Sequence, residues 1–402
     1  MWFFHTLWCK ERCMGIIMEA IRKKAVVIGG DHQNTLGIIR SLGEAGLDVS
    51  AVITEKKYSF VSKSKYLKKY WLVEEDEDAI LQILLSAFAD EKEKIVVIPG
   101  SDFAQMFLDR NFDQLTSVFI FPNIQNKAGE VCYYMNKLNC NRLAAEAGLN
   151  VPYTVQLNLA ECTAEELISA HCFPFPVILK STGGDENSAK SITVVENEAE
   201  LRIALRRLQE KKRSSVLLQE YLDIEEEFGA VGCVFFHSKE IMLPGMIRKI
   251  RFSKVSKTTY GKIVPHVEVI DRNAIFSFLR KLGFVGIFDL ELMICNQKLY
   301  FIELNFRNGA YGYAYTKAGV NFPLLWLSEA LGGKMDSVSD SYFSKDFYFM
   351  YEMADVKTVG KKVSLFKWIR QFLSADAKMV MSWKDFKPFY YKVLYQARGK
   401  KC

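Results

Sequence analysis

The residues best suited to chemistry lie on two neighbouring segments, 287–294 and 299–307, in which polar and apolar side chains alternate. Alternation along a β-strand places every second side chain on the same face. One face of the predicted strand pair therefore carries a polar set: Asp289, Glu291, Glu303, Asn305 and Arg307. The other face carries an apolar set: Phe288, Leu290, Leu292, Ile302, Leu304 and Phe306. The pattern predicts a ladder of oxygen ligands on one sheet face.

The loop between these strands determines which side chains face each other. A three-residue loop, 296–298, places Glu291 opposite Glu303 and Asp289 opposite Asn305, and a one-residue change of loop would break this pairing. Carboxylates directly across a strand pair destabilise it unless a positive charge lies between them. Carboxylate and amide oxygens suit Mg²⁺, which binds one or two carboxylates and completes its shell with phosphates and water. The ladder predicts a magnesium site; the alternative is a solvated sheet face.

Two lysines are candidates for binding phosphate. Lys180 ends an apolar strand and is followed by Gly183 and Gly184, which would allow the backbone to approach phosphate oxygens closely. Lys137 begins a predicted helix. The alternative for each is a lysine that is simply solvated at the end of its element.

The elements that must position these side chains indicate an α/β protein. A buried strand ending at Gly29 and Gly30, a helix over 34–45 and a second strand over 48–53 form a unit typical of a parallel sheet. The predicted organisation is an N-terminal extension (1–23), an α/β domain (24–125), a connecting helix (126–149), a small α+β unit (150–222), a strand-rich unit (223–333) and a basic, aromatic C-terminal extension (334–402).

Composition narrows the class of protein. The 402 residues are half apolar and a quarter charged, which is typical of a globular protein and excludes a disordered chain, and no apolar run is long enough to span a membrane. The net charge of +6 is too small to indicate nucleic-acid binding. The nine cysteines are scattered without a C-x-x-C pair, and the chain opens without the charge-then-apolar order of an export signal. We expect a cytoplasmic protein.

The charge is unevenly distributed, because residues 357–402 contain 12 Lys or Arg and 2 Asp. Apolar side chains recur there at helical spacing: Leu365, Trp368, Ile369, Phe372 and Leu373. Basic residues flank them: Lys361, Lys362, Lys367 and Arg370. This pattern is typical of a helix at an anionic membrane surface, which predicts a peripheral contact with the membrane. The alternative is that the segment packs its apolar stripe on the mildly acidic body.

The order of these features resembles the ATP-grasp superfamily over about residues 24–333, and within it the carboxylate-amine ligases related to carbamoyl-phosphate synthase and D-aspartate ligase. The resemblance is carried by Asn136-Lys137, by Gly148-Leu-Asn-Val-Pro152, by Phe175-Pro-Val-Ile-Leu-Lys180, by Leu218-Gln-Glu-Tyr-Leu222 and by Glu291 with Glu303-x-Asn305-x-Arg307. It implies a Rossmann-like domain that precedes the ATP-grasp unit, a lid subdomain, and an antiparallel-sheet subdomain that binds metal and substrate.

The resemblance also implies roles for individual residues. ATP phosphates would be bound by Lys137, Lys180, Gly183 and Gly184, adenine by Glu220, Tyr221 and Leu222, and ribose by Glu227. Mg²⁺ would be bound by Glu291, Glu303 and Asn305. Arg307 and Lys180 would act on the transferred phosphate, and Arg248, Arg251 and Asp289 are candidates for substrate contact.

The function implied is an ATP-dependent ligase that joins a small carboxylate to an amine through an acylphosphate. A non-catalytic nucleotide sensor is the alternative, because Asp185 and Glu186 in the loop after Lys180 would repel phosphate if they pointed inward. A dinucleotide-dependent oxidoreductase is disfavoured, because Gly29 and Gly30 do not continue into a G-x-G-x-x-G fingerprint. The identity of both substrates and the oligomeric state are left open.

Overall fold

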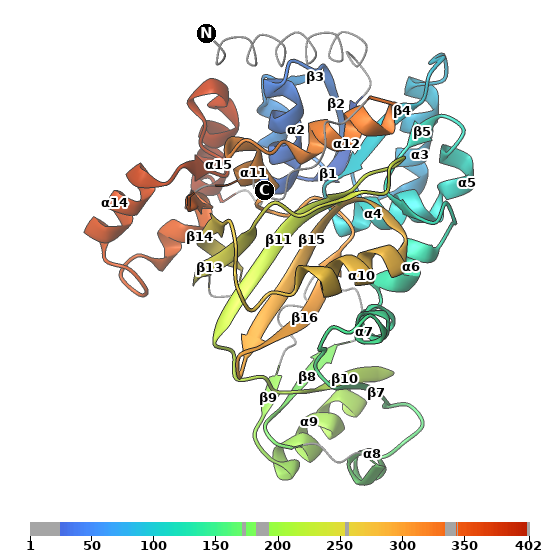
Figure 1. The fold of residues 1–402 in the computed structure, drawn as a ribbon, viewed down its shortest axis with the longest axis vertical. Coiled ribbons are helices and arrows are strands. Elements are labelled where there is room, and N and C mark those ends of the chain that lie inside the picture. Colours follow the sequence, from blue (N-terminus) through green and yellow to red (C-terminus); the bar gives the residue numbers. More distant parts are fainter. Residues whose placement is uncertain are drawn as a thin grey trace.

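The computed structural model describes residues 25–170, 174–181, 193–253, 257–333, 343 and 345–399. The expected N-terminal extension and the loop that contains Gly183, Gly184, Asp185 and Glu186 lie outside the described residues. Figure 1 shows three sheets: one with α-helices at the top, a long central sheet, and a small sheet at the bottom. The α/β fold class is confirmed.

The N-terminal domain is built on a parallel sheet with strand order β3-β2-β1-β4-β5. Its strands are β1 (Ala25–Gly30), β2 (Val49–Thr54), β3 (Leu67–Val73), β4 (Ile95–Pro99) and β5 (Phe119–Ile120). Its helices are α2 (Gln33–Glu44), η1 (Val61–Lys63), α3 (Glu77–Ala87), α4 (Asp102–Arg110) and α5 (Phe112–Leu115). Strands β1 and β4 are completely apolar until their last residues, as expected for strands buried on both faces.

The glycine pair at the end of β1 has a packing role. A Cβ on Gly29 would lie 2.5 Å from Thr35 Oγ1, so only glycine allows α2 to pack this closely. The strand order reverses direction between β1 and β4, which is where ligands bind in open α/β sheets. Helix α4 begins at this point, and its N-terminus is capped by Ser101, whose Oγ accepts a hydrogen bond from Ala104 N.

Two short helices connect this domain to the small unit (residues 150–222). They are α6 (Glu130–Met135), which follows the two-residue strand β6 (Asn123–Ile124), and α7 (Lys137–Glu146). Asn136 Oδ1 caps α7, and Gly148 ends it with a φ of +93°. Lys137 is therefore fixed as the first residue of the helix, as predicted.

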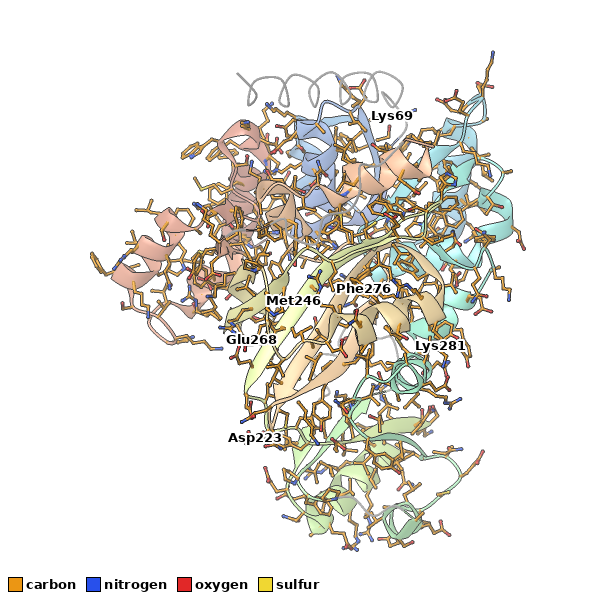
Figure 2. All side chains as sticks on the ribbon, in the orientation of Figure 1. Lys69, Asp223, Met246, Glu268, Phe276 and Lys281 are labelled. Atoms are coloured by element: carbon orange, nitrogen blue, oxygen red, sulfur yellow. The ribbon has the colours of Figure 1, made fainter. Side chains whose placement is uncertain are left out.

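The small unit is a four-stranded antiparallel sheet with order β7-β10-β8-β9. Its elements are β7 (Thr154–Asn158), α8 (Ala164–Ala170), β8 (Val177–Ser181), β9 (Thr193–Val195), α9 (Glu198–Glu210) and β10 (Ser215–Glu220). The strand that ends near Lys180 was predicted, as β8; helix α8 was not. Asp223, labelled in Figure 2, marks where the chain leaves this unit for the central sheet.

The central sheet has the path β16-β15-β11-β13-β14-β17-β18, with β12 beside β11 and β6 beside β15. Its strands include β11 (Glu226–Val234), β12 (Ile241–Met242), β13 (Met246–Phe252), β14 (Thr258–Val264), β15 (Phe284–Cys295) and β16 (Lys298–Asn305). Helix α10 (Arg272–Leu282) packs on one face, in a core that includes Ala230 and Leu290. Helices α11 (Gly312–Lys317) and α12 (Phe322–Ala330) lie on the other face with α2, in a core that includes Val231 and Ile287.

The hairpin of β15 and β16 has the predicted pairing but a different turn. The loop contains two residues, Asn296 and Gln297, both with positive φ, instead of the predicted three. A bulge beside Glu291 then adds one residue to β16, so Glu291 pairs with Glu303 and Asp289 with Asn305. The extra residue is Ile302, which is partly exposed and does not join the apolar face as predicted.

The C-terminal extension continues the central sheet and packs on the body. It contains β17 (Phe347–Met350), α13 (Glu352–Asp355), η3 (Val356–Thr358), α14 (Leu365–Ser374), β18 (Ala377–Lys378), η4 (Trp383–Asp385) and α15 (Lys387–Ala397). Two buried ion pairs join it to the body: Arg251 with Asp355, and Arg40 with Asp385. In the part of the chain that is described, no helix is long and apolar enough to cross a bilayer.

The Arg251–Asp355 pair gives a prediction for stability. Arg251 Nε and Nη2 donate to the two Asp355 oxygens at 2.8 and 2.7 Å, and Trp368 Nε1 also donates to Asp355 at 2.9 Å. Asp355→Ala leaves the guanidinium buried without its partner and should lower the free energy of unfolding by about 3–5 kcal/mol, measured by urea denaturation.

The matched control is Glu146→Ala, which breaks an exposed pair with Lys281 at the end of α10 (Figure 2) and should change stability little. Equal effects of the two substitutions would contradict the anchoring role of Asp355.

Candidate functional site

The carboxylates of the ladder continue an apolar row along the central sheet. Val231 and Ile287 face the core shared with α2, and the same face of β15 then carries Asp289 and Glu291. The opposite face carries Phe288, Leu290 and Leu292, which are buried under α10. The sequence therefore places carboxylates where the sheet extends beyond the N-terminal domain towards the small unit (Figure 1).

Lys249 of β13 is the cation beside Glu291. Its Nζ lies 3.2 Å from Glu291 Oε2 and 3.5 Å from Glu227 Oε2. Burial alone lowers the pKa of Lys249, but the charges of Glu291, Glu227 and Asp289 outweigh it and the pKa is raised. Lys249 therefore stays protonated and offsets the carboxylates on β11 and β15.

Lys137 and Lys180 lie near Glu303, the other carboxylate of the pair. Lys137 Nζ lies 3.4 Å from Glu303 Oε1, and Lys180 Nζ donates a hydrogen bond to Gln219 Oε1 on β10. Burial lowers the pKa of Lys180 to about 8, with a further contribution from the positive charge of Lys137, although Glu303 acts in the opposite direction. Among the residues that the structure describes, no carboxylate lies within ion-pair distance of Lys180, and a half-buried cation of this kind is suited to binding an anionic group.

Arg307 closes the site on the side of the N-terminal domain. Its guanidinium contacts Asp102 at the start of α4 (Nε to Oδ1, 2.9 Å), Asp289 (Nη1 to Oδ2, 3.4 Å) and Asn305 (Nη2 to Oδ1, 3.3 Å). Burial raises the pKa of Asp289 to about 7, and the charge of Arg307 limits this rise. The next residue, Asn308, forms a buried amide pair with Asn34 of α2 (Nδ2 to Oδ1, 2.7 Å). The end of β16 is therefore tied to the parallel sheet.

The segment 220–222 links the small unit to the central sheet. Glu220 Oε2 accepts a hydrogen bond from Tyr153 N at 3.1 Å, Tyr221 is exposed, and Leu222 is buried. Glu227 follows on β11 and faces Lys249. These residues lie where the chain passes from the small sheet, which contains Lys180, to the central sheet, which contains Glu291.

Two of the residues expected near substrate do not join this group. Arg248 Nε contacts Glu226 Oε2 at 3.0 Å, and its guanidinium lies over the ring of Phe228 in the core under α10. Arg251 binds Asp355 and Gln371 of the C-terminal extension. Of the three candidates, only Asp289 contacts the ladder.

Two contributors, Asp102 and Gln219, were not predicted, and Lys249 was expected only as part of a basic strand near the substrate, not as the partner of Glu291. Lys249 lies within the basic stretch Arg248-Lys-Ile-Arg251. Alternation along β13 places Lys249 and Arg248 on opposite faces of the sheet, and the pairing of β13 with β11 determines which face each side chain occupies. Nothing in the sequence around Asp102, apart from its position after β4, indicated that it belongs to the site. Gln219 faces Lys180 only because β8 and β10 are paired.

The ladder fits a divalent cation. Within the described ranges no group of three or more His, Cys, Asp or Glu residues forms a complete metal cage. Glu291, Glu303 and Asn305 instead offer two carboxylates and one amide at adjacent positions, as predicted from the sequence. A set of this size suits Mg²⁺, which takes its remaining ligands from phosphate and water.

Comparison with solved structures identifies the fold. N5-carboxyaminoimidazole synthetase from Staphylococcus aureus in complex with ADP is 16% identical, with a TM-score of 0.61 and coverage of 79% of each chain. L-amino acid ligase from Bacillus licheniformis is 18% identical, with a TM-score of 0.58 and coverage of 77% of this chain and 74% of that one. Biotin carboxylase from Campylobacter jejuni is 16% identical, with a TM-score of 0.62 and coverage of 82% and 76%.

The chain therefore has the ATP-grasp fold, as the order of its motifs predicted. No family model matches the sequence, and no curated protein shows significant sequence similarity to it.

The surroundings of Lys180 give a prediction that does not depend on any ligand. Lys137→Gln removes the positive charge that helps to lower the pKa of Lys180, so this pKa should rise from about 8 towards the ordinary lysine value of about 10.4. The measurement is an NMR titration of the protein with ¹³C-dimethylated lysines. Lys211→Gln, at an exposed position, is the control and should leave the titration unchanged. A Lys180 signal that titrates near 10.4 in the unsubstituted protein would contradict its burial.

Proposed function

We propose that this chain is an ATP-dependent ligase that joins a small carboxylate to an amine through an acylphosphate. The observation that carries the proposal is the pair Glu291 and Glu303 with Asn305, surrounded by cations from separate parts of the fold: Lys137, Lys180, Lys249 and Arg307. Support comes from solved proteins of the same fold, which include an ADP complex, a biotin carboxylase complex described with β-γ-ATP, and an L-amino acid ligase.

In this proposal the nucleotide binds between the small unit and the central sheet. Lys180 and Lys137 contact the phosphates, and Gly183 and Gly184 allow the backbone to approach them. The segment from Glu220 to Leu222 binds adenine, and Glu227 binds ribose. Since Lys180 is half-buried and has no ion-paired carboxylate among the described residues, a phosphate oxygen would balance its charge.

Glu291, Glu303 and Asn305 would hold Mg²⁺, which when bound offsets the negative charge of the phosphates. The residues around them define the remaining chemistry. Arg307 is held by Asp102 and Asp289, so its guanidinium is oriented before substrate arrives and can stabilise charge on the transferred phosphoryl group. Asp289 lies beside Arg307, and we propose that it contacts the substrate.

The reaction proceeds in two steps. A carboxylate oxygen of the substrate attacks the γ-phosphorus of ATP, and the bond to the β–γ bridging oxygen breaks, so ADP leaves with the electron pair. The amine nitrogen then attacks the acyl carbon, the carbon–oxygen bond to phosphate breaks, and the amine loses a proton. Closure of the small unit over the site would exclude water, which would otherwise hydrolyse the acylphosphate.

We also propose a cytoplasmic setting, where ATP is available. The described cysteines, Cys132, Cys140, Cys162, Cys233 and Cys295, are free thiols, which agrees with a reducing compartment.

The first test is Glu303→Gln, which keeps the shape of the side chain and removes one negative charge from the ladder. ADP release in the presence of a panel of amino acids, with hydroxylamine as a general amine trap, should fall at least about a hundredfold while the protein stays folded. Glu146→Gln, on the exposed side of α7, is the matched control and should retain activity. Full turnover in folded Glu303→Gln protein would reject the assignment. Nucleotide binding without ADP release for any substrate in the unsubstituted protein would indicate a sensor instead.

The second test separates phosphate binding from base binding. Lys180→Ala should weaken binding of ATP at least about tenfold and leave adenosine binding nearly unchanged, because the lost interaction is with charge. Isothermal titration calorimetry measures both affinities, and Lys211→Ala is the control. Equal losses for ATP and adenosine would contradict the role of Lys180.

A further inference from the structure

Helix α14 exposes an apolar stripe. Leu365, Ile369 and Leu373 recur every fourth residue, and Phe366 lies beside them; their exposed fractions are 60%, 43%, 72% and 83% respectively. None of the ten residues of α14 is buried. Water-exposed leucine and phenylalanine occur singly on most proteins, but a contiguous row along one helix marks an interaction surface.

The opposite side of α14 attaches it firmly to the body. Trp368 and Phe372 stack with their ring centroids 5.2 Å apart and pack in a small core with Tyr260 and Met350. Trp368 Nε1 donates to Asp355 Oδ2 at 2.9 Å. Gln371 Oε1 accepts from Arg251 Nη1 at 2.9 Å. The predicted apolar stripe is therefore split, and one part docks on the body while the other is held facing outward.

The chain on both sides of the exposed stripe is basic. Lys361, Lys362, Lys367 and Arg370 are all exposed, and the sequence has no Asp or Glu between Lys357 and Ala375. Among the residues that the structure describes, Lys367 and Arg370 have no carboxylate within ion-pair distance. Lys362 donates a hydrogen bond to Phe252 O, so Lys367 and Arg370 are the cations whose charge is left unpaired within the described part of the chain.

We infer that α14 is a contact surface for an anionic membrane. Helix α14 lies at the outer edge of the molecule, away from the small unit (Figure 1). A helix that presents apolar residues beside lysine and arginine is suited to lie in the plane of an acidic lipid surface, with the apolar side chains among the acyl chains and the cations at the headgroups.

A second copy of this chain fits the surface less well. Ten residues of helix span about 15 Å, so one side of α14 offers far less than the roughly 800 Å² per partner of a stable protein interface. Pairing two copies through α14 would also bring two basic segments together. A membrane needs no such area, because a short apolar row and nearby cations act together.

The test is co-sedimentation of the full chain with vesicles. We expect binding to vesicles of equal parts phosphatidylglycerol and phosphatidylcholine, little binding to phosphatidylcholine alone, and weaker binding when salt is raised from about 0.1 to about 0.5 M. Phe366→Ser with Leu373→Ser, and separately Lys367→Gln with Arg370→Gln, should each lower the partition coefficient at least about tenfold. The matched controls are Ile203→Ser and Lys211→Gln, on or beside α9 at exposed positions, which should have no effect.

All four altered side chains in α14 are exposed, so circular dichroism and the melting temperature should confirm that the variants fold. Absence of binding to the acidic vesicles, or binding that survives both double substitutions, would overturn the inference. A dimer in size-exclusion chromatography that Phe366→Ser with Leu373→Ser converts to a monomer, without vesicle binding, would assign the surface to a second copy and would also overturn it.

Discussion

The arrangement of the site depends on balancing carboxylates that face each other across two strands. Glu291 and Glu303 are directly opposite, with Asp289 and Glu227 close by, and like charges in these positions repel each other. The balancing cations come from different parts of the fold: Lys249 from β13, Lys137 from α7, and Arg307 from the end of β16. Because each cation belongs to a different element, the same charges that prepare the site also fix the relative positions of the hairpin, the connecting helix and the neighbouring strand.

Much of the site could be predicted because it lies on a single hairpin. Alternation predicted which side chains of β15 share a face, and the assumed loop predicted the correct partners, Glu291 with Glu303 and Asp289 with Asn305. The assumed loop was one residue too long, and the bulge at Ile302 compensated for this. The sequence offered no sign of a bulge, because Ile302 has the residue type expected of the buried face. The contact of Lys249 with Glu291 was missed for a different reason: its partner strands, β11 and β15, are distant in sequence from β13, and local alternation says nothing about strand order.

The C-terminal extension shows the same limit. Its helical spacing and basic character were evident from the sequence, but the residues that anchor it were not. Arg251 binds Asp355, 104 positions away, and Arg40 binds Asp385, 345 positions away. Those two carboxylates are turned inward, and most of the lysines and arginines around them remain at the surface. The sequence supported two alternatives, packing on the body and an outward-facing stripe, and the structure combines them in one helix.

The amide pair of Asn34 and Asn308 determines which parts of the site can move together. It joins the end of β16 to α2, and Asp102 adds a second link through Arg307, so Glu303, Asn305 and Arg307 form one rigid frame with the parallel sheet. Lys180 is outside this frame, because it lies on β8 of the small unit and is held there by Gln219. A rotation of the small unit would therefore change the separation between Lys180 and Glu303 while leaving the distances among the oxygen ligands constant. Such a rotation would therefore move the charge of Lys180 relative to a set of oxygen ligands whose own geometry stays the same.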